Sequence, residues 1–335
     1  MKFAVGYQTP QNGERFSDLL ADYLPHAAEV YFSWPGMASG RPDMAVHDLG
    51  AQHRLEQELS ALARAGVKLD LLFNANCYGE NAVSEALRDE VLGVLEYLGL
   101  NGCFPQIVTT ASTFIAHVVR EAYPGLELRA SVNMRVGTLQ AMQYLSDAFD
   151  SFYLQRDFQR NLDYVRTVHS WCLKNGKKLC LLANSGCLRF CPAQTFHDNL
   201  IAHSAGAECR KNTGWNPHLC RSVYADPARL VQILKSTWIR PEDLWRYEGL
   251  IDTVKLATRQ HSHPRMVLGA YISGSFCGNL LELLEPGFSS QFYPRYLDNA
   301  AFPEDWAEKS GQCLLGCTGC GYCEEVLSKV LRRYG

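Results

Sequence analysis

The sequence predicts an α/β fold, a (β/α)8 TIM-like barrel, from the alternation of strand and helix patterns, their number, and the turn after the first strand. Short apolar runs alternate with amphipathic stretches of helical length, which is typical of a parallel sheet with right-handed crossovers. Eight such units close naturally into a barrel. An open doubly wound sheet is the alternative, but residues 6–13 read GYQTPQNG instead of a G-x-G-x-x-G fingerprint.

The eight predicted strands are rich in β-branched, aromatic and other apolar residues. They are residues 2–7, 29–33, 68–74, 104–110, 126–132, 150–155, 178–184 and 252–257. The predicted helices repeat their apolar residues at helical spacing. They are residues 15–23, 52–65, 83–98, 113–123, 137–145, 158–173, 226–235 and 264–272.

Two segments lie outside this repeat. An insertion at 185–243, rich in Cys, His, Asn and Gly, follows the seventh strand, and a tail ends in a cysteine-dense stretch and a short basic helix, EEVLSKVLRRY. No low-complexity tract or linker divides the chain. We therefore expect one barrel domain over residues 1–284, insertion included, and a Cys-rich extension over 285–335 that packs on it.

Composition narrows the classes of function. The chain has 335 residues, 47% of them hydrophobic, with 32 Lys and Arg against 35 Asp and Glu, a net charge of −3. A globular protein with a sizeable core is expected, and the charge balance argues against holding nucleic acid mainly by charge. Because no apolar run approaches the length of a membrane span and the first residues do not resemble a signal peptide, we expect a cytoplasmic protein with no membrane partner.

Thirteen cysteines are unusual for such a chain. Cytosolic thiols stay reduced, so clustered cysteines indicate metal chemistry before disulfides. The tail holds Cys313-x3-Cys317-x2-Cys320-x2-Cys323, with glycines that let the backbone wrap around one centre. An iron–sulfur cluster needs such soft sulfur ligands and tight loops, while a tetrahedral zinc site is the alternative.

A second cysteine group lies in the insertion. Cys187-x3-Cys191-Pro follows the seventh strand directly, and Cys209 and Cys220 come later in the same segment. The loop after a barrel strand lies on the face where active sites sit, so we expect metal here as well. A further four cysteines are expected to be structural or inert, and two histidines of the insertion, His197 and His203, to be solvated or helix-capping. The four are Cys103, Cys172, Cys180 and Cys277.

The order of segments resembles the collagenase-like peptidase family (peptidase family U-32). The family's Ala-Asp-Ala-Val-Tyr-Phe-Gly motif is matched by residues 28–32, Leu-Ala-Arg-Glu by 154–157, Ser-Lys-Asp-Leu by 241–244, and Leu-Lys-Ile-Glu-Gly-Arg by 254–259. The similarity covers roughly residues 1–275, and it rests on the ordered set of motifs rather than on any one match.

The resemblance implies a barrel with four cysteines around a 4Fe–4S cluster. Cys187 and Cys191 match two of the ligands, and Cys220 before Arg221 matches the third. The family's fourth cysteine is Trp245 here, so Cys209 is the first candidate to replace it, with Cys77 or a tail cysteine as the fallback. The family's four ligands do not account for the cysteines of the tail, Cys313 to Cys323, so the chain is expected to hold one cluster or two.

The resemblance also implies an activity. Although named as peptidases, family members include oxygen-independent hydroxylases, some of which act on RNA and others in ubiquinone synthesis, with prephenate thought to supply the hydroxyl oxygen. We therefore expect an iron–sulfur hydroxylase or a related oxidoreductase that acts on an anionic small molecule. The alternatives are an accessory subunit that pairs with a homologous partner chain, a peptidase, an RNA-modifying hydroxylase, and a zinc-stapled barrel without redox chemistry.

Cationic residues at strand ends suit such a substrate, because the guanidinium fork matches a carboxylate. We expect Arg156, Arg259 and Lys255 to act in catalysis, and Arg129 and Asn133, which flank the fifth strand's end, to bind substrate. Prephenate, a dicarboxylate, would fit this set. The alternative for Lys255 and Arg259 is pairing with barrel carboxylates such as Asp70 or Asp252.

Overall fold

Eight parallel strands close into one barrel in the computed structural model, which describes every residue except 10–12, 42–48, 204–212, 314–316 and 318. Each strand pairs with the next along the chain, and the eighth pairs with the first. The strands are β1 Phe3–Gly6, β2 Ala27–Phe32, β3 Lys68–Phe73, β4 Ile107–Thr110, β5 Glu127–Ala130, β6 Ser151–Tyr153, β7 Lys178–Leu182 and β8 Thr253–Leu256. The predicted (β/α)8 barrel is confirmed, and every predicted strand overlaps an observed one.

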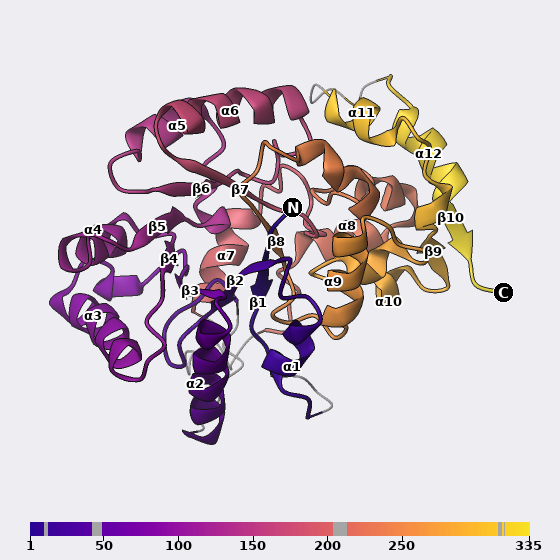
Figure 1. Cartoon of the computed structure of the whole chain (residues 1–335). Coiled ribbons are helices and arrows are strands. Elements are labelled where there is room, and N and C mark those ends of the chain that lie inside the picture. Colours follow the sequence, from indigo (N-terminus) through magenta and orange to yellow (C-terminus); the bar gives the residue numbers. More distant parts are fainter. Residues whose placement is uncertain (10–12, 42–48, 204–212, 314–316, 318) are drawn as a thin grey trace.

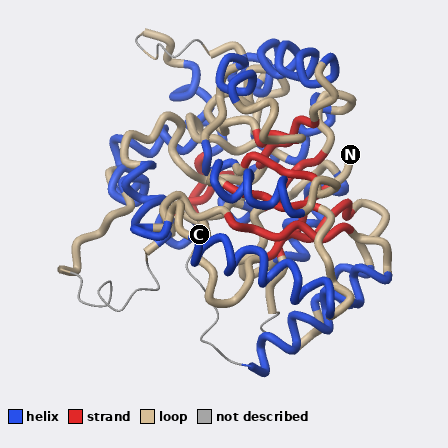
Figure 2. The backbone as a smooth tube through the Cα atoms, turned by 90° about the vertical axis from the view of Figure 1, so that its left-hand side faces the viewer, coloured by secondary structure: helices blue, strands red, loops and turns tan. Residues whose placement is uncertain are grey.

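Helices surround the strands, which gather in the middle of the molecule (Figures 1 and 2). The helices of the repeat are α1 Phe16–Ala21, α2 Leu49–Arg64, α3 Glu85–Leu100, α4 Thr113–Ala122, α5 Leu139–Tyr144, α6 Leu162–Lys174 and α9 Pro264–Ser273. Several begin at the side chains that best cap a helix: Ser84, Ser112 and Asn161 accept hydrogen bonds from the amides of residues three positions on. Two single turns of 3-10 helix, η1 Gly79–Asn81 and η2 Val132–Met134, follow β3 and β5.

The insertion and the tail form short elements beside the barrel. The insertion contains α7 Gln194–Ala202, α8 Leu219–Ala225 and two 3-10 helices, η4 Pro227–Ile233 and η5 Pro241–Tyr247. The tail lies along one side of the molecule, drawn in orange and yellow in Figure 1. Its elements are η6 Leu280–Leu283, α10 Ser289–Phe292, β9 Arg295–Leu297, η7 Asn299–Ala301, α11 Trp306–Gly311, α12 Tyr322–Val330 and β10 Leu331–Arg333.

Two predicted helices differ in the structure. Residues 226–235 form the 3-10 helix η4, which starts at Pro227 and is only seven residues long. The basic helix at the end of the tail stops at Val330, because Leu331–Arg333 pairs antiparallel with Arg295–Leu297. Tyr334 continues this pairing through its amide, which donates to the carbonyl of Pro294. A distant strand therefore outweighs the local helical pattern.

The two surfaces of the barrel wall differ in chemistry. The outer surface packs against the helices in one large apolar core. The inner surface carries four charged side chains that are all buried: Glu29 and Asp70 from neighbouring strands, and Arg129 and Lys255. Cys103, Cys172 and Cys180 are buried as well, as expected for structural cysteines, while Cys277 is exposed.

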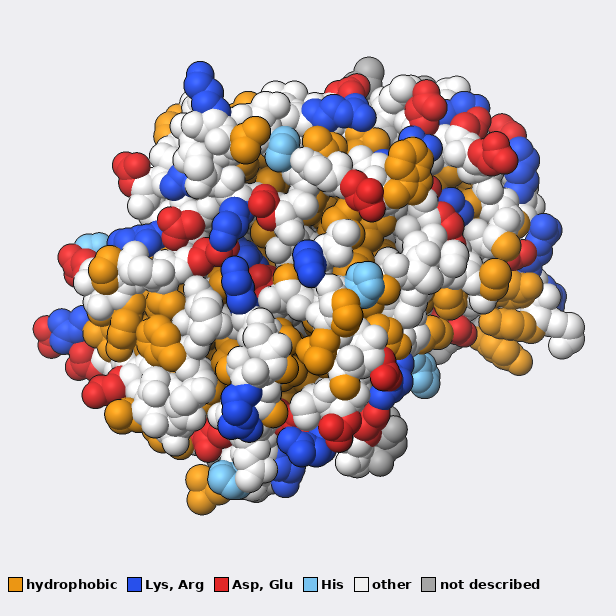
Figure 3. Space-filling model, in the orientation of Figure 1, with side chains coloured by type: hydrophobic (Ala, Val, Ile, Leu, Met, Phe, Trp, Pro, Cys, Tyr) orange, Lys and Arg blue, Asp and Glu red, His pale blue; other side chains and the backbone are white. Residues whose placement is uncertain are grey.

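Basic and acidic side chains are mixed over the face of the molecule drawn in Figure 3. None of the helices in the described part of the chain combines the length and the apolar character that a membrane crossing requires.

Candidate functional site

A cavity of about 300 Å³ lies at the mouth of the barrel, where the strands end. We call it the mouth cavity. Its walls come from Tyr31 and Leu72 at the ends of β2 and β3, from Lys255 in β8, and from the loops that follow β2, β3, β5, β6, β7 and β8. Its charged and sulfur-bearing lining residues are Arg41, Arg156, Cys187, Cys191, Asp198, Cys220, Arg221, Lys255, Arg259 and Glu285. Thiols and cations predicted from separate patterns therefore share one site.

Arg156 is held on the wall of this cavity by the loop after β6. Its Nη1 donates to the Ser185 hydroxyl at 3.0 Å, and the residue is only 9% exposed. Burial lowers the pKa of Arg156, but the neighbouring Cys187 thiol and Asp198 carboxylate outweigh burial and raise that pKa above its ordinary value. The guanidinium is thus a permanent cation next to a predicted cluster ligand.

Lys255 forms part of the cavity floor. Its Nζ lies 3.7 Å from the centre of the Tyr31 ring. Burial lowers the pKa of Lys255, and burial raises the pKa of Asp70, which is one of the charges acting on the lysine. Lys255 therefore faces both the cavity and a barrel carboxylate, while Asp252, the other proposed partner, accepts from the amide of Leu179 at 2.8 Å.

Arg129 does not lie at the mouth, and its predicted role in binding substrate is wrong. The residue sits within β5, so its side chain points into the barrel rather than out of its end. It forms an ion pair with Glu29, donates to Glu127 at 2.8 Å and donates to Ser151 at 3.0 Å. With 1% of its surface exposed, the guanidinium is committed to the interior.

Asn133 and Arg259 both line the mouth cavity, as predicted, and both also hold loops together. Asn133 Nδ2 donates to the carbonyl of Asn74 at 3.1 Å, which ties the loop after β5 to the loop after β3. The two terminal nitrogens of Arg259 each lie 3.2 Å from the Ser39 hydroxyl.

Three of the insertion's cysteines come together on one side of the cavity: Cys187, Cys191 and Cys220. Burial, with the Cys187 thiol as the next largest cause, raises the pKa of Cys220 to about 11, so these two thiols are within electrostatic reach. The fourth predicted ligand, Cys209, lies outside the described residues.

In the part of the chain that the structure describes, no three His, Cys, Asp or Glu side chains converge as ligands of a single metal ion. The ligand sulfurs of an iron–sulfur cluster lie farther apart than those of a single metal ion, because the iron and sulfide of the cluster occupy the space between them.

Cys77, a fallback for the fourth ligand, and Trp245, which stands at the family's own fourth position, do not line the mouth cavity. The sulfur of Cys77 accepts from the amide of Gly79 at 3.4 Å, and Cys77 is not among the residues that line the mouth cavity. Trp245 in η5 is 63% exposed, and its ring contacts the guanidinium of Arg246. The surface location of Trp245 leaves Cys209 as the remaining candidate in the insertion.

Several polar residues of the cavity were not predicted, among them two histidines and two arginines. His197 and His218 have ring centres 4.7 Å apart, and burial lowers the pKa of His197 to about 4, so this ring is neutral at pH 7. Arg41 forms an ion pair with Glu285 at 3.8 Å, and Arg221 follows Cys220. The Cys-Arg pair was a signal for Arg221, but nothing local marks Arg41, because its partner Glu285 lies far away in the sequence.

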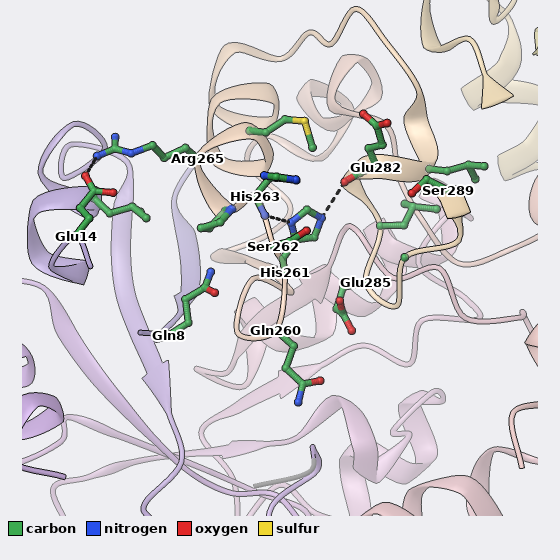
Figure 4. A pocket seen from close by; sticks show the side chains of 16 residues that line it. Gln8, Glu14, Gln260, His261, Ser262, His263, Arg265, Glu282, Glu285 and Ser289 are labelled. Carbon is green, nitrogen blue, oxygen red and sulfur yellow. Dashed lines mark hydrogen bonds and ion pairs between the residues drawn. The ribbon is translucent and has the colours of Figure 1, made fainter. Parts of the chain in front are cut away.

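A larger cavity of about 910 Å³ adjoins the mouth cavity, and Gln260 and Glu285 line both. Figure 4 shows Arg265 and Glu14 directed at one another across one side of it, with the ring of His261 between the chain segments. The Nδ1 atom of His261 accepts from the amide of His263 at 3.0 Å, so its Nε2–H donates to the carbonyl of Glu282 at 2.8 Å. His261 is thus fixed as a structural group. We call the larger cavity, which adjoins the mouth cavity at Gln260 and Glu285, the antechamber.

The tail cysteines line a separate cavity of about 170 Å³, which we call the tail cavity. The described residues on its wall include Cys313, Cys317, Cys320 and Cys323 from the tail and Arg160 from the loop after β6. Burial raises the pKa of Cys323 to about 11, an effect that the nearby Lys235 and Arg160 charges oppose. The structure therefore brings the four cysteines of the predicted run to one cavity.

The fold and this thiol-lined mouth define a (β/α)8-barrel protein with a polar site at the carboxyl ends of its strands. No family model matches the chain. An uncharacterized protease of Methanocaldococcus jannaschii, MJ1657, is 26% identical over 314 residues, covering 91% of this chain and 89% of that protein. Among solved structures, the U32 peptidase Mk0906 is similar with a TM-score of 0.54 and 17% identity, over 76% of this chain and 92% of that one. The predicted resemblance to the U32 peptidase family is confirmed.

Proposed function

We propose that this chain is an iron–sulfur enzyme that modifies an anionic small molecule in the mouth cavity. The observation that carries the proposal is the shared lining: three clustered thiols and five cationic side chains border the same 300 Å³. That volume suits a small ligand. Cations in a low-dielectric cleft bind carboxylates strongly and in a fixed orientation.

Cys187, Cys191 and Cys220 would hold a 4Fe–4S cluster, with Cys209 as its fourth ligand. The residues fit the group because the three described thiols border one space and Arg156 provides a permanent positive charge beside Cys187. When bound, such a cluster supplies one-electron chemistry or a Lewis-acidic iron at the wall of the cavity.

The chain's own side chains would bind and orient the substrate. Arg156 presents a guanidinium for one carboxylate, and Arg41, which pairs with Glu285 at 3.8 Å and keeps 31% of its side chain exposed, is a second cation on the cavity wall. Lys255, its pKa lowered by burial, can exchange a proton nearer to neutral pH than an exposed lysine can. Asn74, whose carbonyl accepts from Asn133, also accepts through its Oδ1 from the amide of Gly40 at 3.0 Å, next to Arg41.

Oxygen-independent hydroxylation is the reaction that best suits this set, with prephenate as the oxygen source. The support is chemical: the two carboxylates of one small molecule can pair with two of the cavity's arginines, and the proposed cluster ligands line the same cavity. Pairing with a homologous chain, as an accessory subunit, would leave these residues in place but require the partner for turnover.

A peptidase is the second candidate, and the names of the two similar proteins favour it. The antechamber of about 910 Å³ opens beside the mouth cavity and has room for a longer chain than prephenate. Peptide cleavage that survives removal of iron would support this candidate over the hydroxylase.

The test is metal analysis and ligand binding on protein purified without oxygen. Cys187→Ser and Cys191→Ser should each remove about four iron and about four sulfide per chain, while circular dichroism keeps the barrel's signal. Cys277→Ser is the matched control, because this thiol is exposed and lies on neither the mouth nor the tail cavity. Wild-type protein should bind prephenate in calorimetry. Unchanged iron in both mouth variants would overturn the cluster assignment, and absence of prephenate binding would overturn prephenate as the oxygen source.

A further inference from the structure

The tail cavity brings together residues from three distant parts of the chain. Its four cysteines come from the last 25 residues, Arg160 comes from the loop after β6, and Leu188 and Lys235 come from the insertion. In Figure 1 the tail helices α11 and α12 run along the outside of the molecule, away from the N-terminal strands. The tail cavity is therefore a site apart from the mouth, built by the packing of the tail on the insertion.

The local backbone turns the thiols toward this space. Gly319 has φ +81° and Gly321 has φ +62°, a left-handed conformation that glycine adopts without strain. The two glycines flank Cys320, and the helix that starts at Tyr322 carries Cys323 in its first turn. The chain thus bends sharply on both sides of Cys320, which is how a short run of residues places several sulfurs around one centre.

Arg160 supplies a second observation that points to a ligand. The residue is 7% exposed, and its guanidinium lies 4.8 and 4.9 Å from the ring centres of Trp238 and Trp306, which stack on one another. Its Nη1 donates to the carbonyls of Leu234 and Ser236, both at 2.9 Å. Its Nη2 is buried and has no hydrogen-bond partner in the described structure. A buried cation with an unused donor is costly unless an anion stands beside it.

We propose that the tail cavity holds a second 4Fe–4S cluster, ligated by Cys313, Cys317, Cys320 and Cys323, with Arg160 as the buried cation that balances its charge. Four thiolates on an oxidised cubane form a net anion, which is the partner that the free Nη2 lacks. Lys235, which pairs with the Glu324 carboxylate of the same wall at 3.1 Å, adds a further positive charge there.

The arrangement favours a cluster over a zinc ion. A single zinc draws four sulfurs to about 2.3 Å from one point. The described thiols do not converge in this way, and they border a space of about 170 Å³ instead. A cubane fills such a space with its own iron and sulfide.

The second centre would stand close to the first. Leu188, between Cys187 and Cys191, lines both the mouth cavity and the tail cavity. The segment that carries Cys187 and Cys191 therefore lines the mouth cavity and also contributes Leu188 to the wall of the tail cavity.

The experiment separates the two sites by variant. Full-length protein is loaded anaerobically with ferrous iron and sulfide, and Cys317→Ser and Cys320→Ser are compared with Cys187→Ser and with the control Cys277→Ser. Each tail variant should lose about four iron and about four sulfide and keep the mouth cluster, and the Cys187→Ser variant should do the reverse. Unchanged iron in both tail variants, or about one zinc per chain that these variants lose, would overturn the tail cluster whatever happens at the mouth.

A second measurement remains informative if the serine variants do not fold. Arg160→Gln should make the reduction potential of the tail cluster more negative, because the lost cation no longer offsets the added electron, and Arg160→Lys should restore it. Lys235→Gln should shift the potential in the same direction, whereas Lys309→Gln, an exposed lysine paired with Asp305, should not. Equal potentials in all four variants would overturn the role of Arg160 and Lys235 in balancing a cluster.

Discussion

The interior of the barrel and its mouth use the same residue types in opposite ways. Inside, Arg129 is surrounded by carboxylates, with Glu29, Asp70 and Glu127 all within 4 Å of its guanidinium. At the mouth, Arg156 donates to a hydroxyl and forms no carboxylate ion pair in the described structure.

The difference follows from position along a strand. A residue in the middle of a barrel strand that points inward meets the side chains of other strands, so its charge is neutralised by the protein. A residue just beyond the strand's end meets a cavity, so its charge stays available to a ligand. A shift of two or three residues along a strand therefore decides whether an arginine is paired inside the barrel or faces the cavity at its mouth.

The largest expected effect tests the interior. Arg129→Leu removes the cation that pairs with the buried Glu29 and Asp70 carboxylates, which should lower the free energy of unfolding by roughly 3–5 kcal/mol in urea titrations. Arg166→Leu is the control, since Arg166 pairs with Asp163 on the surface at 2.7 Å and should cost less than about 1 kcal/mol. Equal, small losses in the two variants would contradict the structural role of Arg129.

The next effect tests the mouth. Arg156→Ala should weaken prephenate binding by about 1.5–3 kcal/mol, roughly 10- to 150-fold in Kd, because a charge-assisted hydrogen bond is lost. Calorimetry under nitrogen measures it, with Arg229→Ala as an exposed control outside the cavity. An unaltered Kd in the Arg156 variant would return this residue to a structural role.

A smaller effect should appear in the pH dependence of binding. Because burial lowers the pKa of Lys255, its positive charge is present at low pH and is lost as pH rises through that lowered pKa, below the ordinary lysine value of about 10.4. As pH rises through this pKa, prephenate affinity should fall by about fivefold, because one charge–charge contact of about 1 kcal/mol is lost.

Lys255→Arg provides the control for this pH dependence, because arginine keeps its charge throughout the range. A binding curve with the same slope in the wild type and in this variant would show that another group titrates.

The smallest effect is expected on the surface. Trp245→Cys places a cysteine where the U-32 peptidase family that the sequence resembles has one, yet the iron content should not change, because Trp245 is 63% exposed and does not line the mouth cavity. Iron analysis of the variant beside the wild type decides this. A gain of iron or a changed visible spectrum would mean that the position reaches the cluster after all.

Much of the fold was predictable because its signals are local. Strand and helix periodicity predicted all eight barrel strands, and the spacing of Cys313–Cys323 and of Cys187 and Cys191 predicted two separate thiol groups. Strand β10 was missed, since its partner β9 lies more than 30 residues earlier in the chain.

The sequence alone determined the barrel and the two cysteine groups, because periodicity and close spacing act between neighbours in the chain. Only the tertiary structure decided which cations face a ligand. Arg129 and Arg156 look alike in sequence, but the former is neutralised by Glu29, 100 residues away, and the latter opens onto a cavity shared with Cys187. Electrostatic pairing depends on distances between segments far apart in the chain, and those distances are set when the barrel closes.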